Sequence, residues 1–136
     1  MKITKLAAVV PGPVRLVGYE RDEVNSLCTD SRKVQPGALF FCIPGLRSDA
    51  HEFAPQAVEA GAAALVVDHE LPVKCPQIVV PDVRSALARM AAAFYGNPAR
   101  NLRLVGITGT KGKTTTSFLV KAILEKAGHK PGLVGT

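Results

Sequence analysis

One stretch decides the fold predicted for the C-terminal part of this chain: Thr108-Gly109-Thr110-Lys111-Gly112-Lys113-Thr114-Thr115-Thr116. It follows residues 102–108, whose apolar character predicts a strand, and it opens residues 113–127, which predict a helix that ends at Gly128. The first N–H groups of such a helix lack intrahelical partners and carry partial positive charge. A strand, a glycine loop and a helix in this order therefore predict a phosphate-binding site.

The residues of this loop have distinct predicted roles. Glycines at 109 and 112 let the backbone close around phosphate oxygens. Lys113 is the candidate catalytic residue because it can neutralise phosphate charge, and the Thr114 hydroxyl is placed to ligate Mg²⁺. The standard G-x-x-x-x-G-K-[ST] spacing would need glycine where Ile107 stands. The alternative interpretation is a glycine-rich turn with a solvated lysine.

The charge distribution favours the phosphate interpretation. The 136 residues carry a net charge of +6, and all of it lies in residues 100–136, where seven Lys and Arg side chains oppose one Glu. Such a basic stretch attracts phosphate. Aromatic residues make up only 5% of the chain, which argues against a stacking platform for nucleic acid. We therefore expect a small phosphate ligand and no nucleic acid.

Composition excludes several other classes of protein. Apolar residues make up 47% of the chain, as in globular domains, but the longest apolar run is too short for a membrane helix or a signal peptide. The three cysteines, at 28, 42 and 75, are odd in number and form no C-x-x-C pair. They are expected to be thiols in a reducing cytoplasm. The three histidines, at 51, 69 and 129, are expected to be surface or core residues and not metal ligands.

The N-terminal part alternates predicted strands with predicted helices, which indicates an α/β fold. One helix is expected at residues 55–60, and a longer one follows the N-cap residue Asp82. The segment Gly96-Asn97-Pro98 predicts a linker, so we expect one domain at 1–99 and the start of a second at 100–136. Strands are expected at residues 24–29, 38–43, 63–67 and 77–80, and the beginning of a further strand at 132–136.

Two groups of motifs resemble the Mur ligases. Gly109–Thr115 is similar to their ATP-binding loop, G-T-N-G-K-T-[TS], which folylpolyglutamate synthetases share in related form. Thr29–Phe40 resembles the D-S-R-x-V-x-P-G-x-L-F signature of the MurE type, and Gly45–Phe53 resembles its G-x-x-x-D-G-H-x-F pattern. The resemblance covers essentially the whole chain, but only the N-terminal part of a MurE-type enzyme.

This resemblance implies an activity and a fold. MurE-type enzymes use ATP and Mg²⁺ to add a diamino acid, meso-diaminopimelate or L-lysine, to UDP-N-acetylmuramoyl-L-alanyl-D-glutamate in peptidoglycan synthesis. The implied fold is a small mixed-sheet UDP-binding domain followed by the first strand, phosphate loop and helix of a Rossmann-like ATPase domain. The site for the diamino acid would lie downstream of Thr136, so this chain alone is expected to be inactive. The alternative is a standalone UDP-sugar- or nucleotide-binding module without catalysis.

The resemblance also implies site residues. Thr29, Ser31 and the loop Leu46-Arg47-Ser48 would contact the UDP-sugar, where hydroxyls suit uracil and ribose and Arg47 suits a diphosphate. The alternative for Thr29-Asp30-Ser31 is a turn that satisfies its own hydrogen bonds. The chain departs from the family pattern at Lys111, where Asn is usual, and at Ala50, where Gly is usual. The residues implied to bind ATP are Gly109, Thr110, Lys111, Gly112, Lys113, Thr114 and Thr115, and Thr114 is the implied Mg²⁺ ligand.

Overall fold

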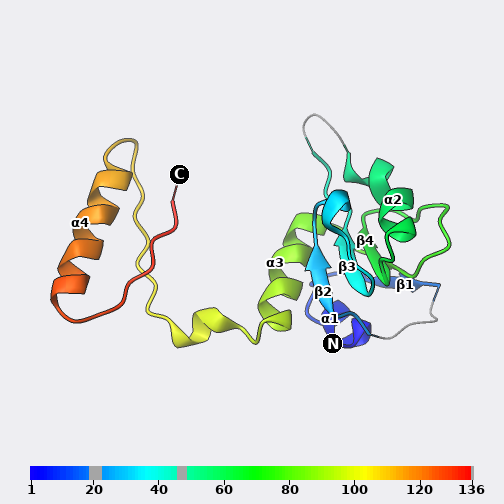
Figure 1. Cartoon of the computed structure of the whole chain (residues 1–136), viewed down its shortest axis with the longest axis horizontal. Helices are drawn as coiled ribbons and strands as arrows, with labels where there is room; N and C mark the ends of the chain where they lie inside the picture. The colour runs from blue at the N-terminus through cyan, green and yellow to red at the C-terminus, as the bar shows by residue number, and fades with distance from the viewer. Residues whose placement is uncertain (19–22, 46–48, 136) are drawn as a thin grey trace. The chain divides into compact units, whose positions relative to one another are not determined.

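In the computed structural model, which describes residues 1–18, 23–45 and 49–135, the N-terminal part is built around a mixed five-stranded sheet (Figure 1). The strand order is β1-β5-β4-β3-β2; β2 to β5 run parallel, and β1 pairs antiparallel with β5. This confirms the predicted α/β class with a mixed sheet. The strands are β1 (Arg15–Val17), β2 (Ser26–Cys28), β3 (Ala38–Phe41), β4 (Ala64–Val67) and β5 (Gln77–Val79).

Three α-helices and short 3-10 helices accompany the sheet. Asp82 caps α3 as predicted, because its carboxylate accepts hydrogen bonds from the backbone N–H groups of Arg84 and Ser85 at 2.8 and 3.2 Å. The short helix α2 forms where it was expected and ends before Gly61, whose φ is +96°. The helices of this part are α1 (Ile3–Ala7), η1 (Ser31–Lys33), η2 (Ala50–Phe53), α2 (Ala54–Glu59) and α3 (Val83–Phe94). A further 3-10 helix, η3 (Pro98–Asn101), lies at the boundary to the C-terminal part.

The sheet is covered on both faces, which explains its continuously apolar central strands. Leu39 and Phe41 of β3 belong to the cluster that packs with α1 and α3. Phe40, between them in sequence, belongs to the cluster that packs with α2. Successive side chains of a strand point to opposite faces, so a strand buried on both faces is apolar at every position. All four residues of β3 and of β4 are buried accordingly.

The parallel direction of β2 to β5 brings their carboxyl ends to one edge of the sheet. Residues 29–31 follow β2, residues 42–45 follow β3, residues 68–70 follow β4, and Asp82 begins the turn into α3 after β5. Ligands of open α/β sheets bind at this kind of edge. Polar residues at these four strand ends are therefore the first candidates for a functional site.

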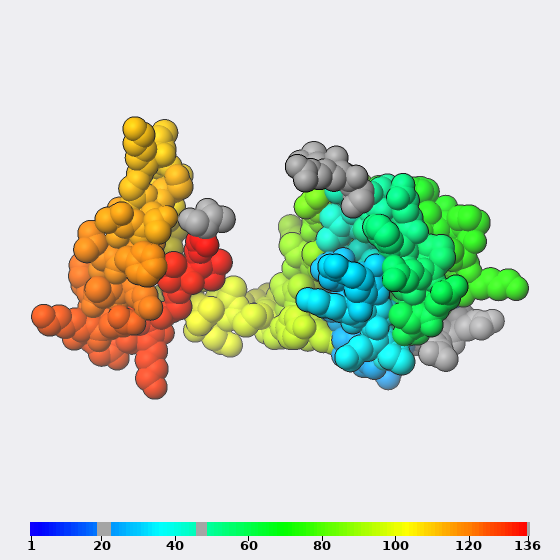
Figure 2. All heavy atoms as spheres, turned by 45° about the horizontal axis from the view of Figure 1, so that its top comes forward, coloured from blue at the N-terminus to red at the C-terminus, as the bar shows by residue number. Residues whose placement is uncertain are grey.

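The chain divides by its internal contacts into Met1–Pro98 and Ala99–Thr136. The second unit holds one long helix, α4 (Lys113–Lys126), preceded by Gly112 at φ +76° and followed by Gly128 at φ +84°. The predicted helix is thus confirmed. None of the described residues of this unit is buried, and Figure 2 shows several side chains standing away from its surface.

The strand predicted at residues 102–108 was wrong: this segment pairs with no other described residue as a strand. Residues 132–135 form no strand either, and Thr136 lies outside the described residues. A strand needs a neighbour to take its backbone hydrogen bonds, and the described part of this unit offers none. Leu104 and Val105 are 75% and 67% exposed as a result, although their apolar character is typical of a sheet interior.

Candidate functional site

An open hollow of about 380 Å³ lies along the edge strand β2 and the turn that follows it. Backbone and hydroxyl groups at the carboxyl end of β2 meet a cationic side chain there, a combination that suits a polar, negatively charged ligand. The hollow has both polar and apolar walls. Its lining residues are Ser26, Leu27, Cys28, Thr29, Asp30, Lys33 and Gln35.

Asp30 organises the turn at the mouth of this hollow. Its carboxylate accepts hydrogen bonds from the backbone N–H of Arg32 at 3.1 Å and from the Arg32 guanidinium at 2.9 and 2.8 Å. The guanidinium hydrogen bonds, followed by the backbone hydrogen bond, lower the pKa of Asp30 to about 2. The carboxylate is therefore already engaged within the turn, which was the alternative considered for this motif.

The two predicted UDP contacts of this turn have different surroundings. Thr29 is exposed and lines the hollow. Ser31 is half-buried and does not line it; its hydroxyl donates to Oε1 of Gln56 on α2 at 3.0 Å. Ser31 thus connects the turn to α2, whereas Thr29 belongs to the lining of the hollow. The remaining predicted contacts, Leu46, Arg47 and Ser48, lie outside the described residues.

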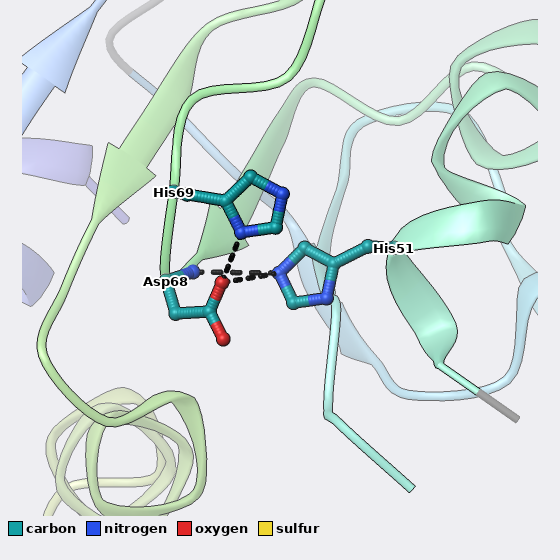
Figure 3. Close-up of side chains that lie close together, drawn as sticks. All are labelled: His51, Asp68 and His69. Atoms are coloured by element: carbon teal, nitrogen blue, oxygen red, sulfur yellow. Dashed lines mark hydrogen bonds and ion pairs between the residues drawn. The ribbon is translucent and has the colours of Figure 1, made fainter. Parts of the chain in front are cut away.

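A histidine–aspartate cluster, formed by Asp49, His51, Asp68 and His69, lies at the carboxyl ends of β3 and β4. Figure 3 shows three of these side chains, His51, Asp68 and His69. Asp49 caps η2 and accepts from the backbone N–H and from Nδ1 of His51, at 3.0 and 2.5 Å. These two hydrogen bonds, the backbone one first, lower the pKa of Asp49. Nε2 of His51 faces Asp68, and the rings of His51 and His69 stack with centroids 4.8 Å apart.

The sequence pattern did not predict this cluster, and the histidines were expected to be unconnected. His51 and His69 are far apart in sequence, and only the parallel pairing of β3 with β4 brings the two segments together. One usable signal was present: Asp68 and His69 directly follow a fully apolar segment that predicts a buried strand. Polar residues in that position face the ligand-binding edge of a parallel sheet.

The predicted phosphate loop stands at the N-terminus of α4. Residues 109–115 are all exposed, and Gly112 has the positive φ that favours glycine. The ammonium group of Lys113 donates to the backbone oxygen of Gly109 at 2.6 Å, so its charge is held over the loop. The N-terminal N–H groups of a fourteen-residue helix and this ammonium form a suitable site for an anion.

A parallel α/β unit joined to a glycine loop at a helix N-terminus is typical of proteins that bind nucleotides. The chain belongs to the Mur ligase family: the pattern described as "Mur ligase family, catalytic domain" matches residues 23–95.

Individual relatives agree with this membership. The chain is 46% identical over all 136 residues to a UDP-N-acetylmuramoyl-L-alanyl-D-glutamate–2,6-diaminopimelate ligase of Bacillus licheniformis, and 49% identical to the ligase of the same name from Geobacillus thermodenitrificans. It spans 28% of the length of each and matches their N-terminal part.

Solved structures give the same result. A ligase structure of the same name superposes with a TM-score of 0.73 at 25% identity, covering 99% of this chain and 27% of that one. MurF from Acinetobacter baumannii superposes with a TM-score of 0.71 at 29% identity, covering 92% and 27%. Across the part of the chain that the structure describes, helices long and apolar enough to span a membrane are absent.

Proposed function

We propose that this chain is the N-terminal part of an ATP-dependent ligase of peptidoglycan synthesis that adds a diamino acid to UDP-N-acetylmuramoyl-L-alanyl-D-glutamate. The observation that carries the proposal is the 46% identity over the whole chain to a ligase named for 2,6-diaminopimelate. That name favours diaminopimelate over L-lysine. The residues that would select the diamino acid belong to the part of the relatives that this chain does not span.

In this proposal the N-terminal unit holds the UDP end of the substrate. The hollow beside β2 offers the Thr29 hydroxyl, and the ammonium group of Lys33 supplies positive charge for a diphosphate. The Asp30–Arg32 hydrogen bonds keep the turn in one conformation before the ligand arrives, which reduces the entropy lost on binding. Leu46, Arg47 and Ser48 are proposed as further contacts from the family motif.

The glycine loop is proposed to hold ATP through residues 109–115. In the reaction a carboxylate oxygen of the D-glutamyl side chain would attack the γ-phosphorus and displace ADP, and the amine would then displace phosphate from the acyl carbon. Lys113 and the loop N–H groups would stabilise charge on the transferring phosphoryl group. Mg²⁺ would add charge neutralisation there; of its about six oxygen ligands, the loop offers the Thr114 hydroxyl.

These 136 residues alone are proposed to be catalytically inactive. Ligation requires ATP, the carboxylate and the amine in one geometry, and most of the rate gain comes from that positioning. The chain spans 28% of the length of its relatives, so most of the groups that would position the amine lie elsewhere. We also propose a cytoplasmic location, supported by three cysteines that are all thiols.

The UDP site is tested by calorimetry with UDP-N-acetylmuramoyl-L-alanyl-D-glutamate in the absence of ATP. Thr29→Val removes the hydroxyl but keeps the branched shape, and we expect about fivefold weaker binding, since a hydrogen bond contributes about 1 kcal/mol. The control is Thr4→Val, which makes the same change at an exposed position of α1. Identical dissociation constants for wild type and Thr29→Val, or a wild type that binds no UDP ligand, would contradict the assignment.

A further inference from the structure

The histidine–aspartate cluster shares no residue with the hollow beside β2 and has no part in the proposed ligase reaction. His51 in η2, and Asp68 and His69 after β4, each offer one ligand atom, and these atoms all lie within 4.8 Å of one another. We propose that this cluster binds one divalent transition-metal ion, with Zn²⁺ as the ion that fits its donors best. Figure 3 shows the three side chains converging from η2 and from the end of β4.

The protonation of His51 follows from its neighbours. Nδ1 lies 2.5 Å from Oδ1 of Asp49, and a carboxylate can only accept, so Nδ1 carries the hydrogen. When the ring is neutral, its lone pair is therefore on Nε2, where the backbone N–H of Asp68 makes a long contact of 3.4 Å. A metal-binding histidine whose other ring nitrogen donates to a carboxylate is a common arrangement, because the carboxylate fixes the ring and makes it more basic.

The distance between Nε2 of His51 and Asp68 suits two ligands of one ion. Nε2 lies 3.1 Å from Oδ1 of Asp68. A metal ion would accept the Nε2 lone pair and the carboxylate oxygen as two coordinate bonds. With bonds of about 2.0–2.2 Å, tetrahedral ligand atoms stand about 3.3 Å apart, close to the separation already present.

Burial divides the cluster into a fixed and an adaptable part. The His51 side chain is 5% exposed and is held by Asp49, so one ligand is in place before the ion binds. The Asp68 and His69 side chains are 36% and 63% exposed. His69 contacts Asp68 through Nδ1, and its exposed ring can turn that nitrogen toward the ion.

The donor set indicates the class of metal. Two imidazole nitrogens and one carboxylate oxygen suit Zn²⁺, Cu²⁺ or Ni²⁺ and not Mg²⁺ or Ca²⁺, which prefer oxygen ligands alone. The exposed side of the cluster leaves room for water as a further ligand. Because the ligands come from η2 and from the end of β4, the ion would connect these two segments and stabilise the folded N-terminal unit by an amount that rises with the logarithm of its concentration above the dissociation constant.

The test is a calorimetric titration of the chain with Zn²⁺ under reducing conditions, followed by thermal unfolding with and without the ion. We expect saturable binding of one ion per chain and a raised unfolding midpoint. His69→Gln should weaken binding at least about tenfold, the loss caused by removing even an indirect partner of a metal ligand. This position is exposed, so the variant should fold. His129→Gln removes the exposed histidine of the other unit and should leave binding unchanged.

Two further variants make the assignment specific. Asp68→Asn should weaken Zn²⁺ binding and abolish the shift of the unfolding midpoint, whereas Glu59→Gln, an exposed carboxylate on α2, should change neither. Cys28→Ser tests whether the half-buried thiol takes the ion instead. The proposal is overturned if the wild type shows no saturable binding, if His69→Gln binds as tightly as the wild type, or if binding depends on Cys28 alone.

Discussion

Gly37→Ala should destabilise the N-terminal unit far more than the same change at Gly96. Gly37 ends the turn before β3 with φ +88°, and a Cβ built there would lie 2.8 Å from Cγ of Asn25. Gly96 follows α3 with φ +74°, but a Cβ there meets nothing within 4 Å. Both changes place alanine in the left-handed region, which costs about 1–2 kcal/mol. Only the change at Gly37 also forces a neighbour to move.

The neighbour that must move is engaged in the same turn. Nδ2 of Asn25 donates to the backbone oxygen of Pro36 at 3.0 Å, and Oδ1 of Asn25 accepts from the Ser26 hydroxyl at 3.0 Å. Each hydrogen bond contributes about 1 kcal/mol, so we expect a loss of about 1–2 kcal/mol for Gly96→Ala and about 3–4 kcal/mol for Gly37→Ala. Alanine also lowers the conformational entropy of the unfolded chain relative to glycine; this effect is common to both variants and cancels in the comparison.

The assay is urea unfolding followed by circular dichroism, with the free energy of unfolding extrapolated to water. Asn25→Ala removes the obstructing amide, so the double variant Asn25→Ala, Gly37→Ala should lose less than the sum of the two single losses. Equal losses for Gly37→Ala and Gly96→Ala, together with additivity in the double variant, would refute the steric argument. The losses in the free energy of unfolding would then come from the backbone conformation of alanine alone.

Two other predictions concern charged groups. In a longer ligase that contains this chain, Lys113→Ala should nearly abolish turnover, whereas Lys111→Asn should be tolerated. If turnover assays found Lys111→Asn to be the more damaging change, the loop would be assigned here in the wrong register. The Arg32 guanidinium lowers the pKa of Asp30 from 3.8 to about 2, so the pair stabilises the folded state above about pH 4 and this contribution disappears as the pH falls to about 2. Urea midpoints of wild type and Asp30→Asn should therefore differ near pH 6 and converge near pH 2; a constant difference would mean that ionisation of this carboxylate is not the cause.

Elements with a local cause were predictable from the sequence. The segment Ala38–Ile43 is continuously apolar because β3 is buried on both faces, and this pattern is specific enough to place a central strand. Asp82 is followed by apolar residues at helical spacing, so both the cap and the buried face of α3 could be inferred. In each case the physical reason for the structure is contained in a few consecutive residues.

Elements held by distant partners were missed or wrong. The five-residue helix α1 was not predicted; tertiary contacts anchor it, among them the hydrogen bond from the backbone N–H of Val24 to the oxygen of Met1 at 2.9 Å. The three residues of β1 are too few for a recognisable alternation. Residues 102–108 have the apolar pattern of a strand, but no described residue pairs with them as a neighbouring strand.

The candidate sites divide in the same way, into features with a local cause and contacts between residues distant in sequence. Thr29 is proposed as a ligand contact from a local motif, and it lines a hollow; its role in binding stays a prediction. The approach of His51 to Asp68 could not be inferred, because it depends on the register in which Phe41 stands opposite Val66 in the parallel pair β3–β4. A single sequence contains no direct record of that register.

The shortness of the outer strands bears on how this chain behaves in concentrated solution. The sheet, as far as the structure describes it, is bordered by β1 and β2, each only three residues long. Arg15 at one border is paired with Glu70, and the turn after the other carries Arg32 and Lys33. Unpaired strand edges invite copies of a protein to join into larger sheets, and brief, charged edges discourage this. The fully apolar strands β3 and β4, which would be most prone to aggregate, lie in the interior of the sheet.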